Sequence, residues 1–477
     1  MSDELPQGWA ITQISDVTER VPNIKPEDSP AKEFGYVDIS SIDNKSFVIT
    51  DVKRIKGKDA PSRARRPIRP DDVVFSNVRT YLRNIALVEP DCAAEVCSTG
   101  FTVLRPNAAV EARYLFRYVL TDEFLDRVTP QQTGTHYPAT SDRVVMSEEI
   151  PLAPLGEQRR IVAKLTELLG KVDACQQRLA KIPVLLKRFR QSVLAAACSG
   201  RLTADWREKR TTDDTDDTDK KPSAKSAKSV VKKSVPIEAE SGEAFPESWQ
   251  TTKLGDLTTL ITSGSRGWAK YYSDSGSTFI RAQNINADFL NLEDIAFVRP
   301  PVSAEGLRTK VQQHDILITI TGANVTKSAL VEKPITDAYV SQHVALVRLK
   351  DARLDKFLFH SVVSPAHARK QLLAAAYGQG KPGLNLENIR DVAVALPPLA
   401  EQQEIVRRVA GLFALADQIE ARFAKAKAQV DKLTPSLLAR AFAGKLVSQD
   451  PKDEPAEKLL ERIHAQPESK SHQDARK

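Results

Sequence analysis

The sequence has little of what membrane proteins and secreted proteins usually carry. Its 477 residues include four cysteines, and no apolar run approaches the roughly 18 residues that a membrane-spanning helix needs. Four cysteines in so long a chain do not make a disulfide framework, which favours a reducing cytoplasm. The start, MSDELPQGWA, contains acids and lacks the apolar core of a signal peptide. We therefore expect a cytoplasmic protein with no membrane segment.

Motifs of catalysis are also absent from the sequence. No Asn/Asp-Pro-Pro-Phe/Tyr tetrapeptide is present, so the pocket typical of adenine methylation is missing. The Gly-Lys steps lack the other residues of a phosphate-binding loop, and Cys92 and Cys97 do not have the spacing of zinc ligands. The triplets Asp43-Asn-Lys45 and Asp51-Val-Lys53 could mimic half of a nuclease motif, but acid-x-Lys triplets are common by chance. The sequence predicts no catalytic residue, no metal and no cofactor.

What the chain does have is ordinary globular composition and an excess of positive charge. Hydrophobic residues make up 41% and charged residues 27%, and the length allows two to four domains. The net charge of +7 fits a polyanionic partner, although many basic proteins bind no nucleic acid.

One phrase occurs twice in the chain. LAPLGEQRRIV starts at Leu152, and LPPLAEQQEIV starts 244 residues later at Leu396. A shift of 244 lays residues 152–202 on residues 396–446 without a gap, and a Gly-x-x-x-Pro stands just before each match. The domain starts also match, through the pairs Pro6/Pro246, Trp9/Trp249, Asp16/Asp256 and Thr18/Thr258. Two copies are too few for a solenoid, so we expect a pseudo-twofold internal repeat.

Both long matches have the pattern of a coiled-coil helix. Apolar residues alternate at steps of four and three from Ile161 to Val193, and again from Ile405 to Leu437. Each helix would run about 44 residues, with a kink or short break at Pro183 or Pro435. The helices could be buried separately in two cores, but their equally long, narrow stripes favour an antiparallel pair.

The remaining segments complete the predicted domain organisation. Residues 1–150 and 245–395 have short strand-like runs and helical stretches, which indicate mixed α/β domains. Residues 206–244 combine aspartate and lysine runs, typical of a flexible linker, with DNA binding by the lysines as the alternative. We predict helical spacers at 151–205 and 396–450 and a polar tail at 451–477. The predicted fold class is α+β, with two mixed α/β domains joined by two long helices that form an antiparallel coiled coil.

These features resemble one family, the specificity subunits of type I DNA restriction-modification systems. The resemblance is carried by the P-L-x-E-Q-x-x-I-V helices, the Pro-x-x-Trp domain starts and the blocks APSRARRPIRPDDVVFSNVRTYLRNIA and SGSRGWAKYYSDSG. It covers residues 1–205 and 245–465. It implies two target-recognition domains, each reading half of a split double-stranded DNA site. It also implies methyltransferase subunits, two in number, and endonuclease/translocase subunits as partners that carry the chemistry.

A dense basic segment in the first domain suits DNA contact. Eight basic residues and one acid fall between Lys53 and Arg69, and prolines prevent a smooth helix there. The planar fork of arginine suits phosphate and guanine, whereas a merely solvated loop is the alternative. The candidate DNA-binding residues in this domain are Lys53, Arg54, Arg63, Arg65, Arg66, Arg69, Arg79, Tyr81 and Arg83.

Gly-rich loops of the second domain carry cations, aromatic rings and amides. They read TSGSRGWAKYYSDSG, TITGANVTK and YGQGKPGLN. Asn and Gln are natural readers of adenine, while a structural role in a turn is the alternative for each residue alone. The candidate DNA-binding residues in this domain are Arg266, Trp268, Lys270, Tyr271, Thr321, Asn324, Lys327, Gln379 and Lys381.

Other functions stay open at this point. A stand-alone DNA methyltransferase or nuclease would need a catalytic motif, and none is present. A purely structural coiled-coil adaptor would not need basic, proline-stiffened loops. A specificity subunit of a modification-only system fits the sequence equally well. We interpret the chain as a non-catalytic, sequence-specific DNA-binding subunit that directs partner enzymes to a bipartite site.

Overall fold

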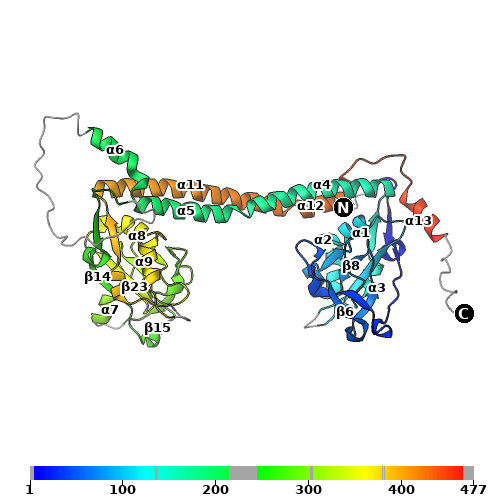
Figure 1. The fold of residues 1–477 in the computed structure, drawn as a ribbon, viewed down its shortest axis with the longest axis horizontal. Helices are drawn as coiled ribbons and strands as arrows, with labels where there is room; N and C mark the ends of the chain where they lie inside the picture. Colours follow the sequence, from blue (N-terminus) through cyan, green and yellow to red (C-terminus); the bar gives the residue numbers. More distant parts are fainter. Residues whose placement is uncertain are drawn as a thin grey trace, which may run out of the picture. The chain divides into compact units, whose positions relative to one another are not determined.

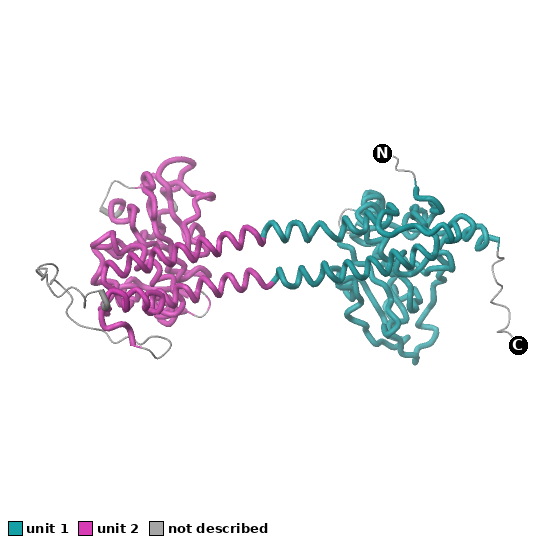
Figure 2. Tube along the Cα trace, turned by 90° about the horizontal axis from the view of Figure 1, so that it is seen from above, with its two compact units in different colours: residues 1–180, 424–477 teal, residues 181–423 magenta. Residues whose placement is uncertain are grey.

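The computed structural model describes residues 5–134, 138–213, 244–300, 304–378, 380 and 382–465. The chain divides into two compact units (Figure 2). Unit 1 comprises residues 1–180 and 424–477, and unit 2 comprises residues 181–423. Each unit therefore combines one sheet-bearing block with parts of both helical spacers.

Unit 1 is built on two four-stranded sheets and two two-stranded pairs. The sheet orders are β6-β3-β10-β7 and β2-β11-β8-β9, and the pairs are β1-β12 and β4-β5. The strands are β1 (Ala10–Gln13), β2 (Thr18–Glu19), β3 (Glu33–Val37), β4 (Ile42–Asp43), β5 (Val48–Ile49), β6 (Lys53–Lys56), β7 (Ala64–Pro67), β8 (Val73–Ser76), β9 (Ile85–Leu87), β10 (Val96–Ser98), β11 (Phe101–Pro106) and β12 (Glu149–Leu152). The helices of this block are α1 (Ala112–Val119), α2 (Asp122–Val128) and α3 (Asp142–Ser147).

Unit 2 also has two four-stranded sheets and two two-stranded pairs, but the edge strand β15 pairs with β19, whereas β7 of unit 1 pairs with β10 at the other edge of its sheet. The orders are β15-β19-β16-β22 and β14-β23-β20-β21, with the pairs β13-β24 and β17-β18. The strands are β13 (Gln250–Lys253), β14 (Thr258–Ser263), β15 (Tyr272–Ser273), β16 (Ser277–Ile280), β17 (Ile285–Asn286), β18 (Phe289–Leu290), β19 (Ala296–Val298), β20 (Ile316–Thr319), β21 (Ser328–Leu330), β22 (Ala338–Val340), β23 (Val344–Leu349) and β24 (Ala393–Leu396). The helices of this block are α7 (Ala304–Arg308), α8 (Asp355–Val363), α9 (Ala368–Ala375) and α10 (Leu386–Arg390).

The strand pairing confirms the internal repeat. β10 runs parallel to β3, with Val96 opposite Tyr36, and β22 runs parallel to β16, with Tyr339 opposite Phe279. In unit 1, α1 packs against β8 and β9 on one side and against α4 on the other (Figure 1). In unit 2, α8 packs against β21 and α5 in the same way. Each core is therefore a sheet, a helix and a spacer helix in three layers.

A buried ion pair occupies the same place in both sheets. Arg105 binds Asp72 at 2.7 Å in unit 1, and Arg348 binds Asp315 at 2.8 Å in unit 2. Both carboxylates are 1% exposed, and each guanidinium also donates to a backbone carbonyl, of Pro67 or of Lys310. A buried charge is tolerated only when it is paired and hydrogen-bonded. The ion pair therefore fixes the position of β8 against β11 in unit 1 and of β20 against β23 in unit 2.

The helical spacers break where the prolines predict. α4 (Leu155–Leu179) is followed by α5 (Ile182–Cys198), which begins one residue before Pro183. α11 (Leu399–Asp431) is followed by α12 (Leu433–Phe442), which begins two residues before Pro435. Proline is tolerated in the first turn of a helix, where no intrahelical partner awaits its missing N–H. In the described part of the chain, no helix is long and apolar enough to cross a membrane.

The spacer helices pair within each unit. In unit 1, Leu165 of α4 shares a core with Leu438 and Phe442 of α12. In unit 2, Arg190 of α5 binds Asp417 of α11 at 2.5 Å. Further along, Arg408 of α11 binds Asp205, which follows α5, at 2.6 Å. The partner numbers fall along α11 as they rise along α5, which confirms antiparallel pairing.

The apolar stripe of the spacers is buried unevenly. Leu165 and Ile405, near the helix starts, are fully buried, whereas Ile419 and Leu433 are 40% and 42% exposed and Cys175 is exposed as well. The buried ends also pack against the sheet-bearing blocks, and a pair of helices alone covers only a narrow seam. The continuous seam that the sequence predicts is thus complete only where a third layer supports it.

A tryptophan–glutamate hydrogen bond explains the two motifs that repeat most clearly. β1 pairs with β12 and β13 pairs with β24, so each domain start lies beside the start of a spacer helix. Trp9 Nε1 donates to Glu157 Oε2 at 3.0 Å, and Trp249 Nε1 donates to Glu401 Oε2 at 3.1 Å. Each glutamate lies in the first turn of its helix, where the helix dipole favours its charge.

The second carboxylate oxygens of Glu157 and Glu401 differ in their hydrogen-bond partners. Glu401 Oε1 accepts from the hydroxyl of Thr203 at 2.7 Å and from the guanidinium of Arg207. Glu157 Oε1 is buried and has no hydrogen-bond partner among the described residues. Burial raises the pKa of Glu157 above its ordinary value.

Glutamine substitutions at these two positions should act in opposite directions. A raised folded-state pKa stabilises unit 1 fully at acidic pH, and this contribution is lost as pH rises through the pKa of Glu157. Glu157→Gln keeps an acceptor for Trp9 without the buried charge, so we expect unit 1 to gain about 1 kcal/mol at pH 7. Glu401→Gln removes the ion pair with Arg207 and should destabilise unit 2 by about 1–3 kcal/mol.

Urea denaturation at pH 7 and pH 4.5, followed by tryptophan fluorescence, measures both effects. The gain from Glu157→Gln should shrink at the lower pH. Equal shifts of the two midpoints in the same direction would contradict the proposed difference between the carboxylates.

Candidate nucleic-acid interface

The repeated Gly-x-x-x-Pro builds a loop cluster in unit 1. Val78, just after β8, forms an isolated β-bridge with Ala139, and Arg79 donates its backbone N–H to the carbonyl of Pro138 at 2.8 Å. Gly134 has a φ of +98°, a conformation that favours glycine. We call residues 77–83, 98–100 and 132–142 loop cluster 1, of which residues 135–137 lie outside the described residues.

Unit 2 repeats the device with different side chains. Thr321, just after β20, bridges to Gly383, and Gly322 donates its backbone N–H to Pro382 at 2.9 Å. Gly378 has a φ of +97°, nearly that of its counterpart in unit 1. We call residues 320–327, 341–343 and 377–383 loop cluster 2, in which positions 379 and 381 are not described. The backbone scaffold is shared, and the side chains on it are not.

A carboxylate organises the base of loop cluster 1. Asp142, at the start of α3, binds Arg66 of β7 at 2.5 Å and accepts from Asn77 at 3.0 Å. The hydroxyl of Thr102 lies 2.7 Å from the same carboxylate. Burial alone would raise the pKa of Asp142, but hydrogen bonds from Arg66 and Thr102 outweigh it and hold that pKa below its ordinary value.

Loop cluster 1 also presents a strained turn. Arg79 and Arg83 have φ values of +51° and +55° and flank the 3-10 turn Thr80–Leu82. Left-handed backbone costs a residue other than glycine about 1–2 kcal/mol, so surrounding contacts must hold it. The buried hydroxyl of Thr80 lies 2.8 Å from that of Thr129, while Tyr81 is 54% exposed. The turn therefore presents an aromatic ring between two arginines.

Loop cluster 2 presents an imidazole and an amide instead. His343 Nδ1 lies 2.6 Å from the hydroxyl of Thr321, and His343 Nε2 lies 3.1 Å from the amide nitrogen of Gln342. Gln342, His343 and Arg281 line a pocket of about 330 Å³. Residues 341–343, between β22 and β23, read Ser-Gln-His, whereas the equivalent residues 98–100, the end of β10 and the turn to β11, read Ser-Thr-Gly. The two clusters thus offer different hydrogen-bonding groups at one position of the frame.

The structure divides the candidate residues of unit 1 into two sets. Five of them belong to or border loop cluster 1: Arg63, Arg66, Arg79, Tyr81 and Arg83. Arg66 binds Asp142 of this cluster, and the backbone carbonyl of Arg63 accepts a hydrogen bond from the backbone N–H of Thr99. The other four bind acids near their own strands. The pairs are Lys53–Asp38, Arg54–Glu95, Arg65–Glu27 and Arg69–Glu19, at 2.8, 3.7, 2.5 and 3.0 Å.

The candidate residues of unit 2 differ in how accessible they are. Arg266 and Lys270 are exposed, and the Lys270 ammonium lies 5.0 Å from the ring centroid of half-buried Tyr271. Trp268 is 4% exposed and stacks on Phe279, so it anchors its loop from below. Thr321, Asn324 and Lys327 are half-buried in the β20–β21 loop, and Gln379 and Lys381 lie outside the described residues.

Several residues of these clusters carried no signal in a single reading of the sequence. Asp142, Asn77 and Thr102 are far apart in the chain, and the turn Gln342–His343 has no motif. A comparison of the two copies could have found the buried ion pair below these loops, since Asp72 and Asp315, and likewise Arg105 and Arg348, are 243 residues apart, close to the shift of 244 between the spacer helices. An alignment of the two copies cannot identify the residues of the loop clusters, because their side chains differ between the copies.

Comparison with known proteins decides the family. A model of the type I restriction modification DNA specificity domain matches residues 246–426. The type I restriction enzyme EcoBI specificity subunit of Escherichia coli is 31% identical over 362 residues, which cover 74% of this chain and 71% of that protein. The chain belongs to the specificity subunits of type I restriction enzymes. Its role is the recognition of DNA sequence in a type I restriction-modification system.

Other specificity subunits are similar over almost the whole chain. The EcoKI specificity subunit of Escherichia coli strain K12 is 27% identical over 97% of this chain and 96% of its own length. A solved structure on complex assembly and conformational transition of the type I R-M system has a TM-score of 0.72. The HsdS subunit from Thermoanaerobacter tengcongensis has a TM-score of 0.61. Each structure is 25% identical and covers 93% of this chain.

The carboxylate of Asp142 should make this specificity subunit sensitive to acid. Because the pKa of Asp142 is lowered in the folded state, its carboxylate stabilises unit 1 at pH values above the ordinary aspartate pKa of about 3.9. This contribution is lost as the pH falls through the folded-state pKa. Asp142→Asn leaves Arg66 without its counter-charge and should destabilise unit 1 by about 1–3 kcal/mol at pH 7. Glu89→Gln, which removes the exposed pair with Arg113, is the control and should change stability by less than about 1 kcal/mol.

Urea denaturation between pH 7 and pH 3 gives both quantities. The wild-type chain should lose more stability over this range than the Asp142→Asn variant does. Parallel pH profiles for the two proteins would contradict the assignment.

Proposed function

We propose that the chain reads a split double-stranded DNA site, with one half read by each unit, and thereby directs methyltransferase and endonuclease subunits to that site. The observation that carries the proposal is the contrast within the repeat. The buried Asp–Arg ion pair, the β-bridges that flank each Gly-x-x-x-Pro and the Trp–Glu bond occur in both units. The side chains on the loop clusters differ, as two readers of two different half-sequences require.

The chemistry of the clusters supports contact with DNA. Arginines such as Arg63 and Arg79 suit phosphate oxygens, which position a protein on the duplex. The amide of Gln342 and the imidazole of His343 carry donors and acceptors that suit base edges. The exposed ring of Tyr81 suits stacking or insertion between bases. Loop clusters 1 and 2 are therefore the proposed reading surfaces.

The partners and the lack of catalysis are parts of the same proposal. Type I relatives of this chain are called specificity subunits, which supports assembly with methyltransferase and endonuclease subunits. Two methyltransferase subunits per chain, the domain boundaries and the cytoplasmic location remain predictions from the sequence. All four cysteines are free thiols, as a reducing compartment would leave them.

Exchange of one turn tests which unit reads which half. Replacing Gln342→Thr together with His343→Gly gives loop cluster 2 the turn of unit 1. We expect discrimination in one half of the recognised sequence to fall about 10–100-fold, because a good base contact is worth about 1–3 kcal/mol. Methylome sequencing of cells with the methyltransferase partner measures this. The control is Arg54→Ala, outside both clusters, and a change in both half-sequences would contradict the division.

The second test concerns catalysis. The purified chain alone should neither transfer a labelled methyl group nor cut DNA, because the sequence lacks the motifs for both reactions. With its methyltransferase partner, it should direct site-specific adenine methylation. Methyl transfer by the chain alone would refute the non-catalytic assignment.

A further inference from the structure

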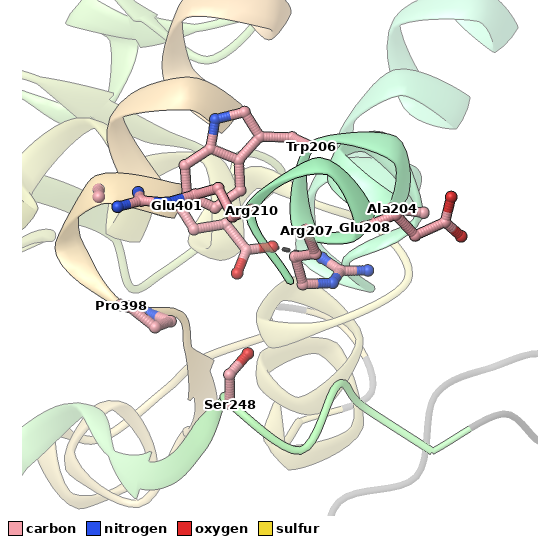
Figure 3. Close-up of a pocket in the computed structure, with 9 residues that line it drawn as sticks. Ala204, Trp206, Arg207, Glu208, Arg210, Ser248, Pro398 and Glu401 are labelled. Carbon is pink, nitrogen blue, oxygen red and sulfur yellow. Dashed lines mark hydrogen bonds and ion pairs between the residues drawn. The ribbon is translucent and has the colours of Figure 1, made fainter. Parts of the chain in front are cut away.

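Two short helices cover the starts of the long spacer helices. In unit 1, Ala456 of α13 (Ala456–His464) donates its backbone N–H to the carbonyl of Gly8 at 2.8 Å, and α13 buries its apolar side in the core. In unit 2, α6 (Ala204–Asp213) and the start of α11 enclose a cavity whose lining includes Arg207 bound to Glu401 (Figure 3). The acids and arginines of this cavity already pair inside the protein, so it indicates no ligand.

A second cavity of unit 2 differs in its chemistry. Its volume is about 330 Å³, and no described residue that lines it carries a carboxylate. Trp268, Tyr272 and Phe279 supply aromatic rings, and Arg281 and the residues of loop cluster 2 from 341 to 343 supply polar groups. Small-molecule sites span about 300–1,000 Å³, so this volume suits a single planar ring system. We call this cavity the aromatic pocket.

The aromatic pocket lies at the carboxyl ends of two parallel strands. Arg281 follows β16 and Ser341 follows β22, and Ser341 donates its backbone N–H to the carbonyl of Ile280 at 2.9 Å. The end of β14 packs tightly against the same turn, since a Cβ at Gly264 would lie 2.2 Å from the carbonyl oxygen of Val340. Ligands commonly bind at the carboxyl ends of parallel strands. The polar groups of the pocket therefore stand on a rigid support.

A serine of the pocket lacks the partners that its counterpart in unit 1 has. The oxygen of Ser98 accepts from the backbone N–H of Gly100 at 3.2 Å, and a side-chain hydrogen bond joins Ser98 to Tyr36. Ser341 and Phe279 stand at the equivalent positions, and phenylalanine has no hydroxyl. The Ser341 hydroxyl is buried and has no hydrogen-bond partner among the described residues. Because such a group costs free energy, a ligand that supplies a partner is favoured.

The depth of the pocket determines which part of DNA can reach it. Gln342 is exposed at the rim, whereas Trp268 and Ser341 are only 4% and 5% exposed. A base that stays in the duplex can meet Gln342 with its edge, but it cannot reach the floor. A base that leaves the stack brings a flat ring to the aromatic side chains and an edge of donors and acceptors to the polar ones. The Ser341 hydroxyl can turn toward that edge, because serine moves among staggered rotamers.

We propose that the aromatic pocket holds one DNA base that is turned out of the duplex while unit 2 reads its half-site. The ring of this base stacks on the aromatic side chains, and its edge meets the Ser341 hydroxyl and the Arg281 guanidinium, whose Nε is buried without a partner among the described residues. Arg266 and Lys270, exposed on the loop that carries Trp268, bind the neighbouring phosphates. The proposal rests on the proposed function, because it requires that unit 2 binds DNA.

Duplexes with an abasic site opposite one base test the extrusion. The full chain in complex with its methyltransferase partner is titrated with the recognised sequence, which methylome sequencing identifies. In each duplex one base is kept, and the nucleotide opposite it is replaced by an abasic site. An extruded base gives up its pairing in any case, so we expect one duplex to bind at least about tenfold more tightly than the intact site. The methylated adenine is left out, because the methyltransferase itself must extrude that base.

Two results would contradict different proposals. If the complex prefers its recognised sequence but binds no abasic duplex more tightly, the pocket proposal is overturned. If the complex does not distinguish its recognised sequence from mixed DNA, the proposed function is overturned instead.

Variants of unit 2 connect the extruded base to the pocket. Ala282→Leu fills the pocket from its wall and should abolish the tighter binding. Ser341→Ala should lower the preference for the correct base at that position about fivefold without lowering the midpoint of urea denaturation, because the hydroxyl has no described partner in the fold. Thr252→Val, which removes another such hydroxyl from β13, is the matched control and should keep the preference. Tighter binding that survives Ala282→Leu, or equal preferences in Ser341→Ala and Thr252→Val, would overturn the proposal.

Discussion

The buried carboxylate in the first turn of each long helix is the constraint on which the rest of the structure depends. A carboxylate with almost no solvent contact requires a donor, and the indole of Trp9 or Trp249 supplies one. To bring that indole into place, the domain start must run beside the strand that leads into the helix. The β1–β12 and β13–β24 pairs do this, and they fix where each helix leaves its domain.

The two units satisfy the buried glutamate at the helix start in different ways. In unit 2, Thr203 and Arg207 satisfy the second oxygen of Glu401, and α6 is held beside the helix start as a result. In unit 1, the second oxygen of Glu157 has no partner within the described residues, and α13 covers the region with apolar side chains. One copy thus uses charge where the other uses hydrophobic cover, although the sheets β2-β11-β8-β9 and β14-β23-β20-β21 and their buried ion pairs correspond.

The sequence predicted the parts of this structure that rest on periodicity and repetition. The paired helices, their breaks near Pro183 and Pro435, and the two α/β blocks follow from spacing and from backbone chemistry. The loop clusters did not follow, because Asp142 meets Arg66 and Asn77 only through tertiary folding, and the left-handed backbone of Arg79 has no local signature. The basic segment illustrates the limit. Composition groups Arg65 with Arg66, but on a strand neighbouring side chains point to opposite faces, so they bind different acids.

The division of the chain into units has a consequence for its synthesis on the ribosome. Unit 2 is one continuous stretch, residues 181–423, and all of it has been translated before the last spacer segment emerges. Unit 1 is interrupted, because its core includes Phe442 packed against Tyr114 and Tyr118. The domain that is made first is therefore completed last, and during translation the apolar side of α4 waits for more than two hundred residues before α12 covers it.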